Sequence, residues 1–220
     1  MKICKMLKKK DVGSIGIGAM IVFIAMVLVA GIAASVLIQT STKLETQAMA
    51  TGSQTTQEVA SGICVFDVLG YTASSSVDIS KIIIGVRPRA GAGGVDLSQA
   101  YVELSDTTKK VILNYTTSYY SEPVGLDDVF NAGVYPSDAN SSASQFGILV
   151  VEDADNSLSM ATPVINRGDK AYICVNVGSC FGTIPERTDI WGMVVGELGS
   201  PGIIAFQTPA SYTDNVMDLQ

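Results

Sequence analysis

Histidine is absent from this chain of 220 residues, which excludes histidine-dependent catalytic triads, zincins and most general acid–base schemes near neutral pH. Charged residues are also scarce: they form 16% of the chain against a usual share of about 25%, whereas 47% of the residues are hydrophobic. The length suits one well-packed domain and is short for two. We therefore expect a protein that is not an enzyme, and we assign no catalytic residue.

Positive charge is scarce outside the N-terminus. The first 13 residues hold five lysines opposed only by Asp11, a charge of about +4, and the remaining 9 basic and 20 acidic residues give residues 14–220 a charge of −11. An acidic body repels phosphates, and no basic stripe with interleaved aromatic residues offsets that repulsion. We expect no nucleic-acid partner.

Residues 12–42 contain no charge at all, and residues 15–38 are almost entirely small and aliphatic. As a helix these 24 residues would span roughly 36 Å, enough to cross a bilayer. The preceding lysines predict that the N-terminus stays in the cytoplasm. A secretory signal is one alternative, although its apolar region is usually shorter and followed promptly by a small-x-small cleavage site. A permanent membrane anchor is the other alternative.

The polar segment after the apolar run predicts that the helix continues. Residues 39–61 lack proline and carry only Leu44, Ala48 and Val59 as regular apolar anchors, while Gly52 costs about 1 kcal/mol relative to alanine. One long helix is predicted over residues 15–61, ending near Gly62. It is apolar on every side in its first half, so it needs lipid or copies of itself.

After Gly62 the pattern changes to short runs rich in β-branched and aromatic residues, separated by turn clusters. Eight such runs, without helical patterns between them, predict an antiparallel sandwich or barrel of immunoglobulin-like type. The fold class is then α+β: a long N-terminal apolar α-helix followed by an all-β immunoglobulin-like sandwich, with residues 118–145 as a long exposed excursion. The predicted strands cover residues 63–71, 77–88, 100–106, 109–117, 146–153, 171–177, 189–198 and 202–209.

Several segments resemble the archaeal flagellins (archaellins). The densest are GIGAMIVFIAMVLVAGIAASVLIQT (16–40) and QEVASGI (57–63), and the head adds FGILVVEDADNS (146–157), TPVINRGD (162–169), FGTIPERTDIWG (181–192) and PGIIAFQTPASYTDNVMDLQ (201–220). The resemblance covers nearly the whole chain. It implies a structural subunit of the archaellum, a homo-oligomeric helical filament shared with related flagellins and used for swimming at the extracellular cell surface.

The resemblance also implies a leader that a prepilin-peptidase-like membrane protease removes before the assembly machinery receives the subunit. Here KKKDVG is followed by SIGIG, which places the cut between Gly13 and Ser14. The charge boundary falls at the same place, although Gly13 could simply interrupt the helix at the membrane interface. The expected parts are a class III leader (1–13), a helix that anchors the precursor in the membrane and forms the filament core (14–61), and an external head (62–220).

The apolar helix suggests how the subunit assembles. A subunit stored in the bilayer buries residues 15–38 in lipid, and in a filament it buries the same surface against neighbouring helices. At about 25 cal/mol per Å², exposing this segment to water would cost tens of kcal/mol. Ala30 with Ala34, and Gly31 with Ser35, are small pairs that permit close helix approach.

Two sequons and one acidic run are candidate modification and metal sites. Asn140 and Asn114 are candidate N-glycosylation sites; Asn140 lies in the exposed excursion and Asn114 near a strand end. Asp153, Asp155 and Ser157 offer oxygen ligands at alternate positions, as calcium loops do, but no EF-hand is completed and an acidic turn is the alternative. A structural calcium ion is the one cofactor considered.

The cysteines and glycines suggest no further chemistry. Cys4 leaves with the leader, so Cys64, Cys174 and Cys180 are odd in number; Cys174 and Cys180 could form a disulfide, or all could remain buried thiols. Gly16 and Gly18 do not complete a dinucleotide-binding pattern.

A non-rotating adhesion pilus and a monomeric anchored binding module are the alternatives to the filament subunit.

Overall fold

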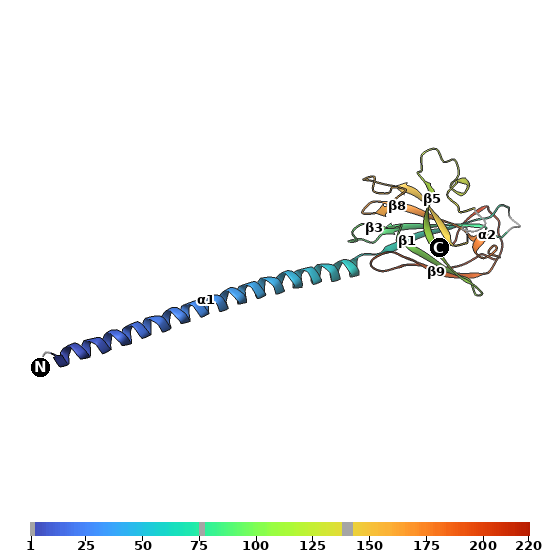
Figure 1. Ribbon diagram of the computed structural model, residues 1–220. Helices are drawn as coiled ribbons and strands as arrows, with labels where there is room; N and C mark the ends of the chain where they lie inside the picture. Colours follow the sequence, from blue (N-terminus) through green and yellow to red (C-terminus); the bar gives the residue numbers. More distant parts are fainter. Residues whose placement is uncertain (1–2, 75–77, 138–142) are drawn as a thin grey trace. The chain divides into compact units, whose positions relative to one another are not determined.

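The computed structural model describes residues 3–74, 78–137 and 143–220. The chain divides into two compact units, Met1–Gln54 and Thr55–Gln220. The first unit consists of most of one helix, and the second contains the end of that helix and a β head (Figure 1). The combination of a long apolar helix and a large β domain is the expected one.

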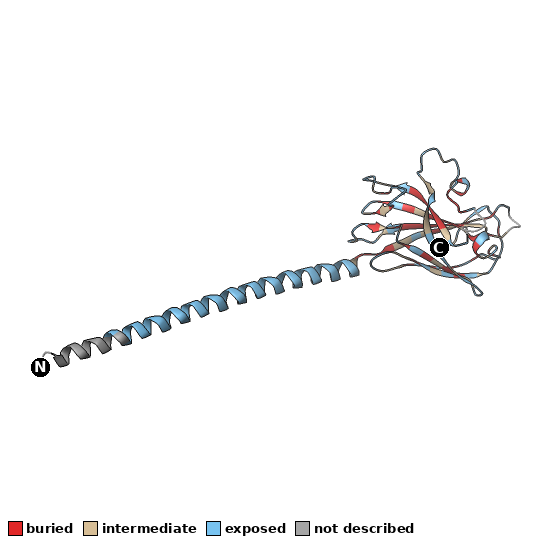
Figure 2. Cartoon of the chain, viewed as in Figure 1, coloured by how far each residue is buried: buried red, intermediate tan, exposed pale blue. Residues whose placement is uncertain are grey.

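Helix α1 (Ile3–Ala60) is 58 residues long. It begins before the predicted start at Ile15, so it runs through Gly13 and Ser14, and it ends one residue before Ser61. The segment contains no proline, and its aliphatic residues lose little freedom in a helix. From Ile15 to Val59 every described side chain is exposed, as the pale blue helix of Figure 2 shows.

Two glycines fix the chain where α1 ends and the head begins. Gly62 has a φ of +148° and Gly199 a φ of +85°. The Ser200 amide donates to the Ser61 carbonyl oxygen at 3.0 Å, and the Ile63 amide donates to the Ser200 carbonyl oxygen at 3.1 Å. A Cβ atom on Gly199 would lie 2.0 Å from the Ser61 oxygen, so no larger residue fits there.

The head is built on a nine-stranded sheet in the order β10-β9-β4-β5-β6-β8-β2-β1-β11, with a separate β3-β7 pair. The short α2 (Val177–Cys180) follows β8, and the 3₁₀ turn η1 (Val129–Asn131) lies between β5 and β6. The strands are β1 (Ile63–Tyr71), β2 (Lys81–Pro88), β3 (Val95–Asp96), β4 (Tyr101–Ser105), β5 (Lys110–Ser121), β6 (Gln145–Glu152), β7 (Val164–Ile165), β8 (Lys170–Asn176), β9 (Asp189–Val195), β10 (Gly202–Gln207) and β11 (Val216–Asp218).

All eight predicted runs form strands, and the three strands not predicted, β3, β7 and β11, have two or three residues each. The antiparallel prediction is wrong for one pair, because β5 and β6 run parallel. A parallel pair needs a crossover connection, and the long segment between these two strands provides it.

The sheet folds over so that its two halves enclose one core (Figure 2). Val102, Val194 and Ile204 from the β10-β9-β4-β5 half belong to the same buried cluster as Ile84 and Ile173 from the other half. A second cluster forms on the outer side of β1, β2, β6 and β8, where Phe130, Val134 and Tyr135 of the excursion cover Ile83, Leu149 and Cys174.

The end of the chain connects the two edges of the sheet. Leu219 donates its amide to the Val68 carbonyl oxygen at 2.8 Å, which extends the pairing of β11 with β1. The Gln220 side chain then reaches β10: its Oε1 accepts the Ala205 amide at 2.7 Å, and its Nε2 donates to the Ile203 carbonyl oxygen at 3.3 Å.

Candidate assembly surface and accessory sites

The most prominent candidate functional surface is the apolar half of α1. Its large hydrophobic side chains between Ile15 and Ile38 are 53–73% exposed. This segment is long and apolar enough to cross a membrane, a test that a signal sequence near an N-terminus also passes. A helix that is apolar on all sides is stable only when lipid or protein covers it.

One face of this segment is hollowed. Val22, Ala25, Met26, Val29, Ala30 and Ala33 line a shallow, open hollow, and their spacing of three and four residues places them on one side of the helix. Three of the six are alanines, which allow another helix to approach closely. Of the small residues predicted for close packing, Ala30 lines this hollow and Gly31, Ala34 and Ser35 do not.

The predicted cleavage site lies within α1. Gly13 and Ser14 are both in helical conformation, and Gly13 is exposed. Among the residues that the structure describes, none from another part of the chain lies within 4 Å of the position of a Cβ on Gly13. Cleavage between Gly13 and Ser14 stays a prediction.

The acidic run forms part of a three-carboxylate cluster. Carboxylate oxygens of Asp153, Asp155 and Asp169 all lie within 4.8 Å of one another, an arrangement that could hold a metal ion. Asp169, in the turn before β8, was not predicted, because it lies far along the chain and only the fold brings it here. Ser157, a predicted ligand, donates its hydroxyl to Val164 O at 2.7 Å and to Asp169 Oδ2 at 3.3 Å.

The same carboxylates also hold the loop together. Asp153 accepts the amides of Ser157 and Leu158 at 3.2 and 3.1 Å, and the buried Asp169 accepts those of Ala154 and Asn166 at 3.1 and 2.9 Å. Hydrogen bonds from Ser157 and Asn166 lower the pKa of the exposed Asp155. The donor set is all oxygen, as calcium prefers. Calcium binding stays a prediction, and the alternative is an acidic turn that binds no ion.

The predicted disulfide does not form in the structure. Cys174 belongs to the outer cluster under the excursion, whereas Cys180 belongs to the main core. Burial raises the pKa of the Cys174 thiol to about 12 and that of Cys180 to about 11. Both are buried thiols in the structure, which was the alternative considered from the sequence, and Cys64 on β1 is half-buried.

One of the two sequons lies on a described strand of the head. Asn114 lies on β5 with its side chain exposed, opposite Tyr101 of β4. Asn140 lies outside the described residues. Glycosylation of either asparagine stays a prediction.

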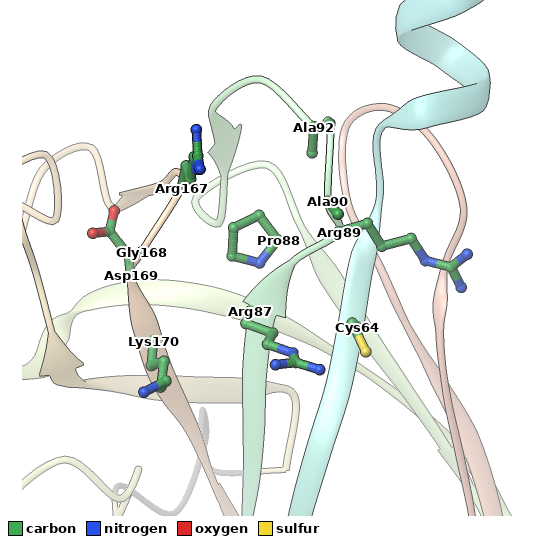
Figure 3. A pocket seen from close by; sticks show the side chains of 11 residues that line it. Cys64, Arg87, Pro88, Arg89, Ala90, Ala92, Arg167, Gly168, Asp169 and Lys170 are labelled. Carbon is green, nitrogen blue, oxygen red and sulfur yellow. The ribbon is translucent and has the colours of Figure 1, made fainter.

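A basic groove, not predicted from the sequence, lies at the end of the head where β1 begins (Figure 3). It has a volume of about 980 Å³. Cys64 is paired with Arg87 across β1 and β2, and the adjacent β8 contributes Lys170, so these three form a row on the outer side of the sheet. Its lining residues are Cys64, Arg87, Pro88, Arg89, Ala90, Gly91, Ala92, Arg167, Gly168, Asp169 and Lys170.

The chain is similar to known proteins over its whole length. It is 40% identical to Flagellin B2 and 41% identical to Flagellin B1 of Methanocaldococcus jannaschii, in both cases over 100% of each chain. The crystal structure of archaeal flagellin FlaB1 from that organism matches with a TM-score of 0.65 and 34% identity, covering 73% of this chain and 98% of the other.

A structure of the archaeal flagellum of Methanospirillum hungatei strain JF1 shares the fold at 13% identity, with a TM-score of 0.58, covering 92% of this chain and 98% of the other. The family model described as archaeal-type flagellin matches residues 13–206. The chain belongs to the archaeal-type flagellin family.

Proposed function

We propose that this protein is a structural subunit of the archaellum filament, which polymerises through α1 and serves swimming motility. The observation that carries the proposal is the exposure of every large hydrophobic side chain from Ile15 to Ile38 beside a head that has a complete core of its own. Lipid or protein must cover such a surface, and in a filament the α1 helices of neighbouring subunits would cover it. Family membership supports this choice.

Assembly in this proposal is a transfer of α1 from lipid to protein. The precursor is held in the membrane by the apolar half of α1, and the same side chains become buried among neighbouring helices in the filament. The hollow lined by Ala25, Ala30 and Ala33 allows a neighbour to approach closely. Contacts of this kind need not close on themselves, and repetition then gives an open helical polymer.

Maturation belongs to the same proposal. We infer that a prepilin-peptidase-like protease removes residues 1–13, so that the mature chain begins at Ser14, and that the archaellum assembly machinery then takes the subunit. The change from a lysine-rich to an uncharged segment at this point supports the inference, as does the start of the family match at residue 13. The mature protein is extracellular, as part of the filament.

The test is to shear filaments from the cell surface, purify them and sequence the protein that they contain from its N-terminus. The expected reading is SIGIG, starting at Ser14. A chain that retains Met1 and is recovered from detergent as a monomer would instead support an anchored binding module. Filaments built from this chain on cells that adhere but do not swim would support an adhesion pilus.

A further inference from the structure

Three of the four cations that line the basic groove have no acidic partner among the residues that the structure describes. Arg87, Arg89 and Arg167 are exposed, and among the described residues none of them is in an ion pair. Lys170 is paired with Glu152 at 2.8 Å. The buried Asp169 also lines the groove, but its two oxygens already accept amide hydrogens from Ala154 and Asn166.

This concentration of positive charge is unusual for so acidic a head. Residues 62–220 contain 8 basic and 18 acidic residues, and four of the 8 basic ones line the groove. Asp169 also lines the groove, so the remainder of the head has 4 basic residues against 17 acidic ones. Outside the groove, the head of a second copy is therefore predominantly acidic.

One segment of the head fits the groove better than the others. Residues 118–145 contain no lysine or arginine, and the loop at residues 122–128 carries three exposed carboxylates, those of Glu122, Asp127 and Asp128. Within this loop Val124 is 87% exposed, and Gly125 makes a turn with a φ of +83°. Figure 1 shows the connection after β5 projecting from the sheets.

The loop projects but is held at its base. Leu126 and Val129 pack against the outer cluster, and Phe130 is buried in it, stacked on Tyr71 with ring centroids 4.9 Å apart. The Asp128 side chain accepts the Phe130 amide at 3.0 Å through Oδ1, whereas the exposed carboxylates of Glu122 and Asp127 accept no hydrogen bond from the described residues and are the better placed to bind a partner. A loop held in this way loses little conformational entropy when it docks.

We propose that the basic groove is a contact between filament subunits and receives the 122–128 loop of a second copy of this chain. The proposal rests on the filament function and adds a head-to-head contact to it. Arginine guanidinium groups in the groove bind the loop carboxylates, a pairing whose geometry favours two parallel hydrogen bonds. Groove and loop are different patches, so the contact is heterologous and can repeat along a polymer.

Cys64 provides a direct test, because it lines the groove while Cys174 and Cys180 are buried. Filaments from cells that make only the Val124→Cys subunit are treated with a short bismaleimide and analysed by denaturing gel. The expected result is a ladder of dimers and higher oligomers, which disappears when Cys64→Ser is added. Thr213→Cys, an exposed position at the other end of the strands, is the control and should give no ladder.

Charge variants test the chemistry of the contact. Arg87→Glu with Arg167→Glu should lower the crosslinking yield of Val124→Cys about tenfold, because like charges then face each other. Adding Glu122→Lys and Asp127→Lys to the same chain should restore the yield.

Three results would overturn the contact. The first is the absence of a ladder when Val124→Cys filaments are treated. The second is a crosslinked product that runs only at the position of the monomer, since the link then lies within one subunit. The third is an equal ladder from Thr213→Cys. All three leave the filament function intact, whereas the absence of this chain from surface filaments would remove that function itself.

Discussion

At the scale of single residues, Gly199 shows how one position fixes the start of the head. Its positive φ favours glycine, and a Cβ atom would overlap the Ser61 carbonyl oxygen, which accepts the Ser200 amide. Gly199→Ala must therefore break that hydrogen bond or move the chain, at a cost of at least about 2 kcal/mol. Thermal unfolding of detergent-dispersed subunits, followed by circular dichroism, measures the loss.

The matched control for this change is Gly93→Ala. No atom lies within 4 Å of the Cβ position at Gly93, and its φ is not in the left-handed region. The midpoint of thermal unfolding of Gly93→Ala should equal that of the unchanged protein. A Gly199→Ala midpoint equal to that of Gly93→Ala would show that the segment from Ser61 to Ile63 adapts without the bond.

The three head cysteines should differ in reactivity because only the thiolate is nucleophilic. Burial raises the pKa of Cys174 to about 12 and that of Cys180 to about 11, so both remain protonated at pH 8, whereas Cys64 is half-exposed. Iodoacetamide at pH 8 should modify Cys64 in dispersed native subunits, and all three cysteines after denaturation. Mass spectrometry of the peptides gives the result; rapid native labelling of Cys174 would contradict its burial.

At the scale of elements, α1 makes the strongest prediction. Val27 lies in the middle of the apolar half, and Val27→Asp would place an unpaired carboxylate in the filament core of every subunit, at about 3 kcal/mol or more each. Cells that make only this variant should have no filaments and should not swim. Electron microscopy and motility plates measure both effects.

Gln47→Asp is the control within the same helix. It adds the same charge to the polar second half of α1, where the side chain is exposed and neighbouring residues are already polar. Filaments should form normally. Normal filaments from Val27→Asp would show that the apolar half of α1 is not the core.

The three-carboxylate loop predicts a calcium effect on stability. An ion that binds only the folded head at 100 times its dissociation constant adds about 2.7 kcal/mol, which raises the midpoint of unfolding by roughly 5–11 °C in a domain of this size. Asp155→Asn should remove this increase, since Asp155 is the exposed member of the cluster, and Asp127→Asn should retain it. Identical midpoints in calcium and in a chelator would mean that the internal hydrogen bonds alone close the loop.

The elements also show what the sequence can reveal. The alternation of side chains and the turn residues were enough to predict eight strands, and the uncharged aliphatic composition was enough to predict α1. The two-residue strands β3 and β7 have too few side chains to show a period, and the parallel β5–β6 pair depends on a long connection whose path no local pattern contains. Asp169 and the row of Lys170, Arg87 and Cys64 were missed for the same reason. The pairing of β6 with β8 brings Asp169 beside Asp153, and the pairings of β1, β2 and β8 bring the three residues of the row together.

At the scale of the whole molecule, an exported subunit with two sequons should carry glycan. The intact mass of the purified subunit is expected to exceed the mass of residues 14–220, and Asn140→Gln should reduce the excess. Asn114→Gln measures the contribution of the exposed strand position. A mass equal to that of the bare polypeptide would remove the glycosylation prediction for both sites.

The closure of the sheet by Gln220 matters most when many heads are crowded together. A filament holds each head permanently beside others, and an exposed strand edge under those conditions is a template for lateral β-pairing and amyloid-like aggregation. On β10 the Ala205 amide and the Ile203 carbonyl are already occupied by the Gln220 side chain. These two backbone groups of β10 are therefore not available to a strand of a neighbouring head, which leaves less of this edge open to lateral pairing.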